Sequence, residues 1–456
     1  MNSAGLAHAI AETLYLVGDR LPAETRRRAL AALDQRIFAP MRVSYATGQG
    51  QTWLKVESNW NPVCLAGVTG AALAVLPDRP ERARFVAAAE HYSDYYLASF
   101  TDDGYDLEGI GYWAYGFDRF AMLREELWGA TEGKLDLFDH PKTHRAALFG
   151  REFQMLPGNY ADFGDARFLT KRSESLIAYI ESTFGLPATT KARVSLGGSV
   201  ESEALARFPY PSQLKNTGII GQEPSALRTY YEEAGVLVAR PAPGGELAIT
   251  VKAGGNGPHS HNDIGSYAIG LGATQPVGDP GGPLFYNSTT FTAHRFDSKL
   301  LNSWGHPVPV IGGKLQLNAT KVHPAILDKQ FTASKDTISM DLTKAYDSPG
   351  LRRVVRTVVY SRGAGGSIQI EDKFDLAGPT SIEESLPTHE TCKQIDANTL
   401  EFTLDGKRLR ATIQAPSDLE VRQEAVNEYG NPFTHVGVRL QLQESGTVII
   451  RFTPVH

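Results

Sequence analysis

The sequence predicts an α+β protein with more than one domain, in which a helical N-terminal half precedes an antiparallel β-sandwich. Three observations support this. Apolar residues recur at helical spacing to about residue 200, short runs that alternate apolar and polar residues dominate after about residue 208, and glycine and proline turns separate those runs. A chain of 456 residues is long enough for two or three domains.

The helical half begins with an amphipathic stretch over residues 4–16. Pro22 then opens a second helix that runs to about residue 37, because the N–H that proline lacks would have no partner at a helix start. Asp78 precedes a long helical run at 83–97. Further helical stretches are expected at 69–76, 117–127 and 143–153. Helices joined by loops rich in Gly, Asn and aromatic residues favour a helical array or toroid.

The β half is predicted from short runs with period-two alternation. Turn pairs such as Asp405-Gly406 and Asn431-Pro432 separate them, which is typical of an antiparallel sandwich. The expected strands are 235–239, 247–252, 354–360, 367–370, 400–403, 409–413, 436–442 and 447–452. The predicted division of the chain is a helical toroid domain over 1–208, a linker over 209–226, a β-sandwich domain with a metal site over 227–380 and a further β-sheet portion over 381–456.

Composition argues against several kinds of partner. Hydrophobic residues make up 42% and charged residues 21% of the chain, which is ordinary for a globular protein. The formal net charge of −6 provides no basic field for nucleic acid. No segment is apolar enough to span a bilayer, and the N-terminus lacks the regions of a signal peptide. A cytoplasmic location is expected, or a periplasmic or secreted one if the chain begins at a mature terminus; homo-oligomers are left open.

The most informative motif is the run His-Ser-His-Asn-Asp at residues 259–263. On an extended segment, His259 and His261 point to the same side, so one imidazole can act on a substrate while the other holds a metal. Asp279 and His306 follow in other glycine-containing loops. Imidazole nitrogen and carboxylate oxygen both suit zinc. Two interpretations are therefore open: these residues are the ligands of one zinc ion, or they are unrelated residues of the surface or the core.

The helical half holds a second motif, rich in glycine and aromatic residues, between Thr101 and Arg119. If a helix begins near Tyr112, then Tyr112, Tyr115 and Arg119 share one face of it. Aromatic packing between helices, with Arg119 reaching solvent, explains the same pattern. Upstream, Trp60 lies between two asparagines, which alone most often marks a loop or a helix cap.

In their order and spacing, these motifs resemble those of the heparinase II/III-like polysaccharide lyases. The resemblance covers nearly the whole chain. It rests on Asn59-Trp60, Asp103-Gly104, the run from Glu108 to Gly116, the run from His259 to Asp263, Asp279 with the Pro-Gly-Gly after it, and the run from Asn302 to His306. It implies an α/α toroid, an incomplete helical barrel, followed by antiparallel β-sheet domains. It also implies cleavage of an acidic, uronic acid-containing polysaccharide or oligosaccharide by β-elimination.

β-Elimination explains why such side chains are needed. The enzyme removes the C5 proton of a uronate, which lies next to a carboxylate, and expels the glycosidic oxygen at C4. The carboxylate must be neutralised by donors or a cation, because its negative charge opposes the carbanion. A base then takes the proton and an acid protonates the leaving oxygen. Tyrosine, with an ordinary pKa of about 10, is a ready acid at neutral pH, and histidine can accept or donate there.

The resemblance assigns roles residue by residue. Tyr112 corresponds to the tyrosine that protonates the leaving group and can also abstract the proton, with Tyr115 as the alternative. His259 corresponds to the catalytic histidine, as second base or neutraliser, and Asn59 to the asparagine that binds the substrate carboxylate. The expected ligands of a structural metal, typically zinc, are His261, Asp279 and His306.

One position departs from the pattern. Many relatives have a histidine directly after the carboxylate-binding asparagine, where this chain has Trp60, so a narrower stereochemical range is expected. Trp60 either stacks on a sugar ring or lies in the core. Asp263 is expected to bond an imidazole from outside the metal site. The other residues expected at the substrate site, with helix capping or loop contacts as their alternative roles, are Asn61, Glu108, Arg119 and Arg295.

Two other functions are compatible with the sequence. A glycoside hydrolase would need two facing carboxylates, such as Asp103 with Glu108 or Asp165, roughly 5–10 Å apart. A non-catalytic carbohydrate- or metal-binding scaffold would bind without turnover. The lyase is favoured because Tyr112, His259 and Asn59 occur in motifs that match those of the lyases. The carboxylates, by contrast, form no obvious acid/base pair. The uronate, its sulfation and endo or exo action depend on the shape of the cleft.

Overall fold

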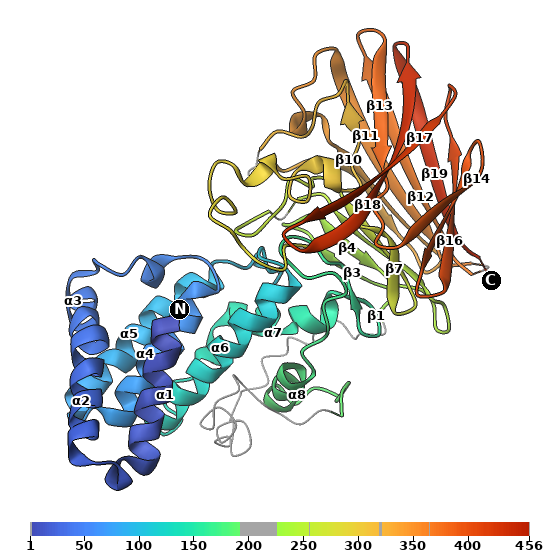
Figure 1. Cartoon of the computed structure of the whole chain (residues 1–456). Coiled ribbons are helices and arrows are strands. Elements are labelled where there is room, and N and C mark those ends of the chain that lie inside the picture. The colour runs from blue at the N-terminus through green and yellow to red at the C-terminus, as the bar shows by residue number, and fades with distance from the viewer. Residues whose placement is uncertain (1, 192–225, 255, 319–321, 364, 456) are drawn as a thin grey trace. The chain divides into compact units, whose positions relative to one another are not determined.

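The computed structural model describes residues 2–191, 226–254, 256–318, 322–363 and 365–455 (Figure 1). The described residues fall into two compact units. The helical unit takes its residues from 1–106, 112–150 and 173–221, and the β unit from 107–111, 151–172 and 222–456. Two short segments from the helical half of the sequence, 107–111 and 151–172, therefore belong to the β unit.

The helices expected from the sequence are present. They are α1 (Asn2–Val17), α2 (Ala23–Leu33), α4 (Trp60–Val75), α5 (Arg79–Leu97), α6 (Ile110–Ala130) and α7 (Pro141–Glu152). Two further helices, α3 (Ala39–Thr47) and α8 (Glu174–Thr183), were not predicted. The helix expected from Pro22 to about residue 37 ends at Leu33, and a π-helical turn over Asp34–Phe38 leads on into α3. Asp78 caps α5, since its carboxylate accepts the Glu81 N–H at 3.0 Å.

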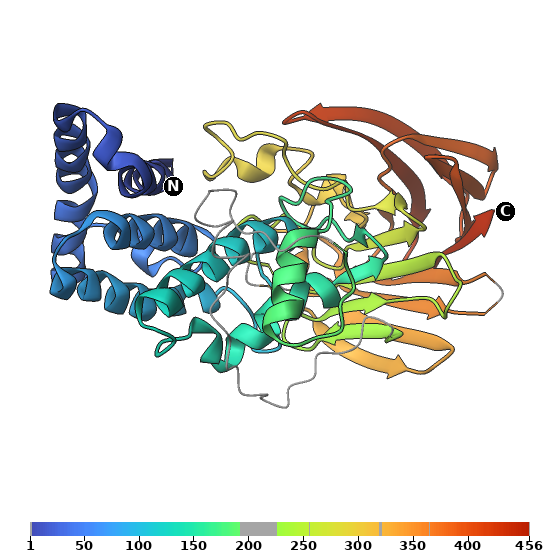
Figure 2. The same ribbon diagram turned by 90° about the horizontal axis from the view of Figure 1, so that it is seen from below.

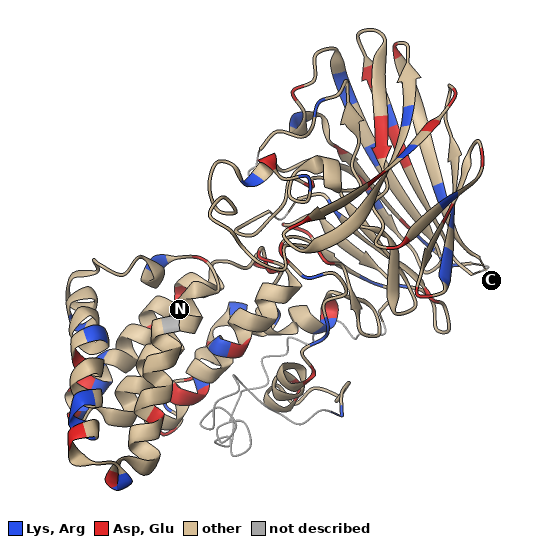
Figure 3. Ribbon diagram, in the orientation of Figure 1, with Lys and Arg blue, Asp and Glu red and all other residues tan. Residues whose placement is uncertain are grey.

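α4 is largely buried, because its residues 61–72 are all inaccessible or nearly so. α1 and α5 pack against it. Gly67 permits the close approach of α1, since a Cβ there would stand 2.7 Å from the backbone of Ala4. α2, by contrast, carries Glu24 and the three consecutive arginines 26–28 (Figure 3). Such a helix keeps most of its surface in solvent.

The β unit is built from antiparallel strands, as expected. They are β1 (Gln154–Leu156), β2 (Asn159–Tyr160), β3 (Arg228–Tyr231), β4 (Val236–Ala239), β5 (Leu247–Lys252), β6 (Tyr267–Leu271), β7 (Thr274–Gly278), β8 (Val310–Ile311), β9 (Ala325–Phe331), β10 (Lys335–Asp341), β11 (Leu351–Ser361), β12 (Ser367–Leu376), β13 (Thr380–Ser385), β14 (Thr391–Asp396), β15 (Thr399–Leu404), β16 (Lys407–Gln414), β17 (Glu420–Glu428), β18 (Asn431–Leu442) and β19 (Ser445–Val455).

These strands form four sheets. Besides the β1-β2 pair, there is a five-stranded sheet β3-β4-β5-β6-β7 and a four-stranded sheet in the order β17-β18-β13-β8. The largest sheet has eight strands in the order β14-β15-β16-β19-β12-β11-β10-β9. Seen from below, the yellow-green strands of the five-stranded sheet run beside orange strands of the eight-stranded one (Figure 2).

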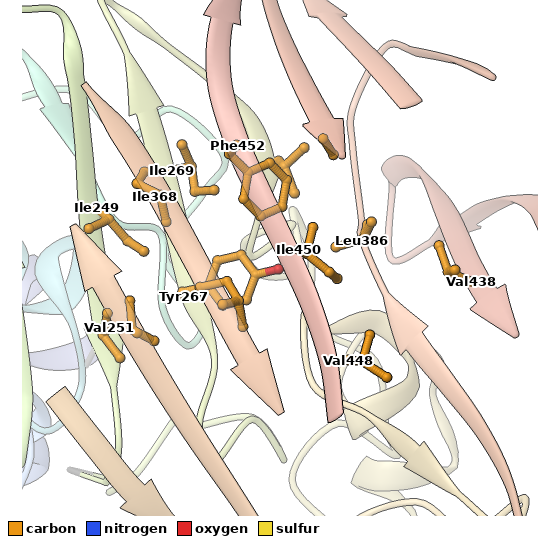
Figure 4. Packing of buried hydrophobic residues seen from close by; sticks show 14 of the residues in the cluster. Ile249, Val251, Tyr267, Ile269, Ile368, Leu386, Val438, Val448, Ile450 and Phe452 are labelled. Atoms are coloured by element: carbon orange, nitrogen blue, oxygen red, sulfur yellow. The ribbon is translucent and has the colours of Figure 1, made fainter. Parts of the chain in front are cut away.

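The main core of the β unit joins these sheets. Figure 4 shows Ile249 and Tyr267 of the five-stranded sheet beside Ile368, Ile450 and Phe452 of the eight-stranded sheet. The rings of Tyr267 and Phe452 meet edge-on, with centroids 6.3 Å apart. Along β11, buried residues alternate with more exposed ones, as a strand with one face in the core requires. Each fully buried Ile or Phe contributes about 1.5–3 kcal/mol, so this core holds the scaffold of the site rigid.

The structure differs from the division expected within the β half. Strands from both sides of residue 380 share one sheet, because β19, near the end of the chain, pairs with both β12 and β16. The expected boundary between 227–380 and 381–456 therefore cuts through a single sheet. Of the expected linker over 209–226, residues 209–225 lie outside the described residues.

Two hairpins show how local sequence sets a turn. Asp405 and Gly406 join β15 to β16 with φ angles of +48° and +76°. A two-residue hairpin turn of this type needs positive φ at both positions, which Asp-Gly tolerates well. Tyr429 and Gly430 join β17 to β18 in the same way, with φ angles of +50° and +77°. The turn expected at Asn431-Pro432 is therefore wrong by two residues, and that pair begins β18.

The sequence predicts no segment that is apolar enough to cross a membrane. In the described part of the chain, no helix combines the length and the apolar character needed to cross a bilayer.

Candidate functional site

The loop that carries the His-Ser-His motif is not the extended segment that the sequence predicts. Residues 257–263 form turns between β5 and β6, and His259 has a φ of +64°. A left-handed conformation is uncommon for a residue other than glycine, although histidine adopts it more readily than most. The two imidazoles nevertheless reach one place, since those of both His259 and His261 contact the carboxylate of Asp165.

Asp165 is the centre of this site. Its Oδ2 atom lies 2.9 Å from Nδ1 of His259 and accepts a hydrogen bond from the Tyr286 hydroxyl at 3.1 Å. Its Oδ1 atom lies 2.9 Å from Nε2 of His261 and accepts from Nη2 of Arg295 at 2.8 Å. The carboxylate is fully buried. Burying a charged group is tolerated only when donors satisfy it, and these four side chains supply them.

The donors determine the charge of Asp165. Burial alone would raise the pKa of this carboxyl group, because it disfavours the ionised form. Hydrogen bonds from His259 and His261, with the charge of Arg295, outweigh burial and hold the pKa well below its ordinary value. Asp165 is therefore ionised at neutral pH and acts as an acceptor. A neutral imidazole that donates one N–H to it keeps a lone pair on its other nitrogen.

Glycines bring the loops of the site together. The Asp165 N–H donates to the His259 carbonyl at 3.1 Å. Gly164 has a φ of +68°, and a Cβ there would stand 2.9 Å from the same carbonyl oxygen. A Cβ at Gly257 would stand 2.6 Å from the Cβ of Leu107. Both positions need glycine because the neighbouring chain comes too close for a side chain.

His259 is the imidazole of this pair that a substrate can reach. Its side chain is 11% exposed, whereas that of His261 is fully buried. Nε2 of His259, the nitrogen that faces away from the central carboxylate, lies 3.5 Å from Oε1 of the buried Glu108. Phe291 meets the imidazole edge-on with ring centroids 5.2 Å apart, and the Tyr286 ring lies 6.1 Å away. Both aromatic rings are exposed, so they border the open side of His259.

The expected metal ligands come together in a buried cluster. Ligand atoms of His261, Asp279 and His306 all lie within 4.8 Å of one another. Nδ1 of His261 and Nε2 of His306 are buried and have no hydrogen-bond partner in the described part of the chain. Such orphaned atoms are rare unless an unseen ion or water satisfies them. Two imidazole nitrogens beside a carboxylate fit a transition metal such as zinc.

Asp263 does not bond an imidazole, contrary to the prediction. Its two carboxylate oxygens lie 2.8 and 2.7 Å from Nζ of Lys252 on β5, and both side chains are buried. The acidic partner of His261 is Asp165 instead, from a segment 96 residues upstream. The Lys252–Asp263 ion pair ties the histidine loop to the five-stranded sheet. It therefore contributes to the site by holding that loop in place.

The helical unit places the other expected catalytic residues on and beside α6. This helix begins at Ile110, two residues before the expected start, and carries Tyr112 and Tyr115. Tyr115 is 41% exposed, whereas Asn59 is buried. A Cβ at Gly116 would stand 3.0 Å from the Asn59 Cβ. Because Tyr112 and Gly116 are one helical turn apart, Asn59 lies beside the helix face that carries Tyr112.

Two expected substrate-binding residues of the helical unit have contrasting surroundings. Trp60 begins α4 and is 47% exposed, so the alternative that it lies in the core is wrong. Asn61 is buried, and its amide donates to the carbonyls of Leu54 and Tyr92, each at 2.9 Å. The Asn61 amide thus bonds within the fold, where the sequence suggested contact with a substrate.

The three remaining expected substrate-binding residues also have internal contacts. Arg295 is buried and donates to the carbonyl of Thr290 at 3.1 Å, in addition to Asp165. Its placement corresponds to the loop contact that the sequence left as an alternative. Arg119 lies on α6 with Nη1 3.7 Å from the sulfur of Met122, and Glu108 is buried beside His259. Contact of these residues with a substrate remains a prediction.

Sequence reasoning missed the central role of Asp165 and did not consider Tyr286. Asp165 was weighed only as a hydrolase carboxylate. A weak signal was present, since Asp165 follows a glycine in a polar loop. Nothing in the sequence, however, connects that loop with a histidine 94 residues away.

Comparisons with known proteins support the fold. No protein-family model and no curated protein matches this sequence. Among solved structures, the heparinase III BT4657 gene product matches with a TM-score of 0.66 and 13% identity, covering 90% of this chain and 61% of its own. Another heparinase III structure matches with a TM-score of 0.62 and 14% identity, and the match covers 87% of this chain and 61% of the other. The heparan sulfate lyase HepC from Pedobacter heparinus matches with a TM-score of 0.63 and 12% identity, and the match covers 91% of this chain and 62% of the other.

These matches confirm, at the level of the fold, the resemblance read from the motifs. The helical toroid followed by an antiparallel β-sandwich is the architecture of these structures. The chain spans less than two thirds of the length of each of them.

Proposed function

We propose that the protein is a polysaccharide lyase that cleaves an acidic, uronic acid-containing polysaccharide, such as a glycosaminoglycan, by β-elimination. The observation that carries the proposal is the Asp165–His259 pair on the fold of heparinase III. An ionised, buried carboxylate orients an imidazole whose other nitrogen faces away from it, beside two exposed aromatic rings. This is the arrangement expected of a general base or acid held in one orientation.

His259 is assigned to the C5 proton or to the charge that develops when it leaves. With Nδ1–H directed at Asp165, Nε2 can accept a proton, and the imidazolium that forms is stabilised by the nearby carboxylate. Asn59 is assigned to the substrate carboxylate, whose charge a donor must offset before the carbanion forms. Tyr112, with Tyr115 as the alternative, is assigned to protonation of the glycosidic oxygen at C4.

The residues His261, Asp279 and His306 would hold the metal. A zinc ion there would act by fixing the loops around His259, since His261 also bonds Asp165. Every step on the sugar is assigned to side chains of the chain itself. The role proposed for the metal is therefore structural.

The geometry disfavours the hydrolase alternative. A glycoside hydrolase needs one carboxylic acid that is protonated at the start of the reaction. Asp165 cannot serve, because it is buried and its donors hold its pKa low. Glu108 is also buried, next to His259. The lyase assignment uses these carboxylates to orient the histidine, which agrees with their burial.

The test is the ultraviolet absorbance of the C4–C5 double bond formed by elimination, measured with a panel of acidic glycans. Tyr112→Phe is expected to lower the rate by about 10²- to 10⁴-fold, the range typical of a lost general acid. Tyr115→Phe, which removes the hydroxyl of the alternative residue one turn away on α6, is measured beside it. Loss of activity in Tyr115→Phe alone would transfer the role to that residue.

Two outcomes contradict the proposal. Release of reducing sugar without new absorbance would indicate a hydrolase. Binding of acidic glycans with no turnover under any condition tested would indicate a scaffold.

A further inference from the structure

The turn between β17 and β18 lies against the loop that carries Asp279, one of the expected metal ligands. The Leu284 N–H donates to the Tyr429 carbonyl of this turn at 3.0 Å. A Cβ at Gly430 would stand 3.1 Å from Cε1 of Phe285 on the same loop. The turn and the loop come from distant parts of the sequence, so these contacts connect the last sheet strands with the metal site.

Asn431 begins β18, is buried, and directs its side chain into the loop. Its Nδ2 donates to the carbonyl of Pro280 at 2.9 Å and to that of Gly282 at 3.0 Å. An asparagine amide nitrogen carries two N–H donors, and both are used here. The two carbonyls flank Gly281, so the side chain bridges the turn that follows Asp279. An aspartate has no such donor, and a serine hydroxyl has only one.

The bridged turn determines where the carboxylate of Asp279 lies. Gly281 has a φ of +74°, and its N–H donates to Oδ1 of Asp279 at 3.0 Å. Oδ2 of Asp279 lies 3.0 Å from Nδ1 of His306, which is another expected ligand. Because the carboxylate is bonded to its own turn, a shift of that turn would move the carboxylate away from the imidazoles.

The same turn is also held from its other side. The Gly282 N–H donates to the carbonyl of Ala166, the residue after Asp165, at 2.6 Å. A Cβ at Gly282 would stand 2.3 Å from Cα of Asp165, so glycine is required there. Nε2 of His389 lies 2.9 Å from the Pro280 carbonyl and is a second donor to it. The turn is thus clamped between β18 and the backbone beside Asp165.

We propose that Asn431 is a positioning residue for the metal site, which fixes Asp279 in place before an ion binds. A site whose ligands are ordered in advance loses less conformational entropy on binding. The inference rests on the proposed function, because the metal is expected to hold the loops around His259. It gives a role to a side chain that supplies no ligand atom and lies 151 residues from Pro280 in the sequence.

The experiment measures the affinity of the full chain for Co²⁺ after a chelator has removed bound metal. Co²⁺ held by imidazole and carboxylate absorbs visible light, so its binding is followed directly, by competition with a chelator of known affinity. We expect Asn431→Ala to weaken Co²⁺ binding about tenfold, at the lower end of the range for residues behind metal ligands. A residue that only stabilised the fold would leave the affinity of the folded protein unchanged.

Asn159→Ala is the matched control. Asn159 is also buried, and its Nδ2 donates to the carbonyls of Gly272 and Thr274 at 3.1 and 2.9 Å, in the turn between β6 and β7. This variant therefore removes the same pair of hydrogen bonds from a turn that carries none of the expected ligands. We expect its Co²⁺ affinity to stay within about twofold of that of the wild type.

Asn431→Asp covers the case in which Asn431→Ala does not fold. It keeps the size of the side chain and removes both donors, so it should weaken Co²⁺ binding by at least the same factor. Folding of each metal-free variant is checked by circular dichroism. Wild-type affinity in a folded Asn431 variant, an equal loss in Asn159→Ala, or a wild type that binds no Co²⁺ overturns the assignment. The measurement uses no glycan, so its failure is distinguishable from failure of the absorbance test.

Discussion

Two histidine–carboxylate clusters of the β unit invite comparison. In the first, Asp165 contacts His259 and His261, and all three residues lie in loops. In the second, Glu383 of β13 lies with Oε1 2.9 Å from Nε2 of His435 on β18, and its other oxygen accepts from Arg439 on the same strand. Both clusters combine a buried carboxylate with an imidazole and a guanidinium. Composition alone therefore does not distinguish them.

The second cluster has the residue types of a hydrolytic triad, but a substrate cannot reach its serine. Oγ of Ser385 lies 3.2 Å from Nδ1 of His435, which completes a Ser-His-Glu series with Glu383. Ser385 is only 2% exposed. The Trp304 ring is stacked on the His435 ring with centroids 3.7 Å apart. A nucleophile must meet its substrate, so this cluster is a structural one.

The difference lies in how the two clusters are assembled. Glu383 and Arg439 are direct partners in the β13–β18 register, so ordinary strand pairing is enough to place them. Asp165 and His259 meet through glycine-dependent loop contacts, and His259 has a left-handed backbone. Register builds a closed and satisfied cluster, whereas the strained loops leave one imidazole open to solvent.

The sharpest test of this contrast is Asp165→Asn. An asparagine is neutral and has one acceptor oxygen, so it cannot accept hydrogen bonds from both imidazoles and Arg295 as the carboxylate does. It also lacks the negative charge that stabilises the His259 imidazolium. We expect the elimination rate to fall about 10³- to 10⁴-fold, the scale seen when the acid that orients a catalytic histidine is neutralised. Activity is measured by ultraviolet absorbance and normalised to the folded fraction from circular dichroism. A folded variant with wild-type activity would contradict the central role of Asp165.

Removal of the metal is expected to have the next largest effect. Asp279→Asn should lower the bound metal, measured by atomic emission, and reduce activity about 10- to 100-fold, since a metal held by these residues would act on His259 through His261 and Asp165. A chelator should lower the free energy of unfolding of the wild type by about 3 kcal/mol, the amount lost when a ligand at 100 times its Kd is removed. The same chelator should leave Asp279→Asn unchanged, which serves as the control. Equal metal content in both proteins would exclude the assigned ligands.

The smallest effect is expected for Glu383→Gln, the matched change in the second cluster. Burial raises the pKa of Glu383, but hydrogen bonds from His435 and Arg439 outweigh it and hold the pKa below its ordinary value. Its stabilisation is therefore present above about pH 4.3, the ordinary pKa of glutamate, and is lost as the pH falls through the lower folded-state pKa.

We expect Glu383→Gln to cost about 1 kcal/mol of unfolding free energy at pH 7, since a hydrogen bond to a charged group is worth about 1.5–3 kcal/mol and Arg439 is partly exposed. The cost should shrink in denaturant titrations at acidic pH. Activity should stay within about twofold of the wild type, because no residue of this cluster is assigned to the reaction on the sugar. A large loss of activity would show that the two clusters are not separate in function.

Part of the site could be predicted because it depends on residue type and on neighbours in sequence. His261, Asp279 and His306 suit one metal by their chemistry, and the structure brings them together. Tyr112 and Tyr115 share α6 because helical spacing is a local property. The prediction for Asp263 was wrong because its buried partner, Lys252, lies on the neighbouring strand and competes for the carboxylate more strongly than an imidazole does.

The amino-acid sequence by itself determined the two-part fold and the hairpin at Asp405-Gly406, because periods of 3.6 and 2 residues and turn preferences act over a few neighbouring positions. Only the tertiary structure decided that Asp165 joins His259 to His261, and that Tyr286 and Phe291 border the open imidazole. The contacts of Asp165 with the two histidines join loops 94 and 96 residues apart along the chain. They depend on how closely glycine allows two backbones to approach, which no local pattern of side chains records.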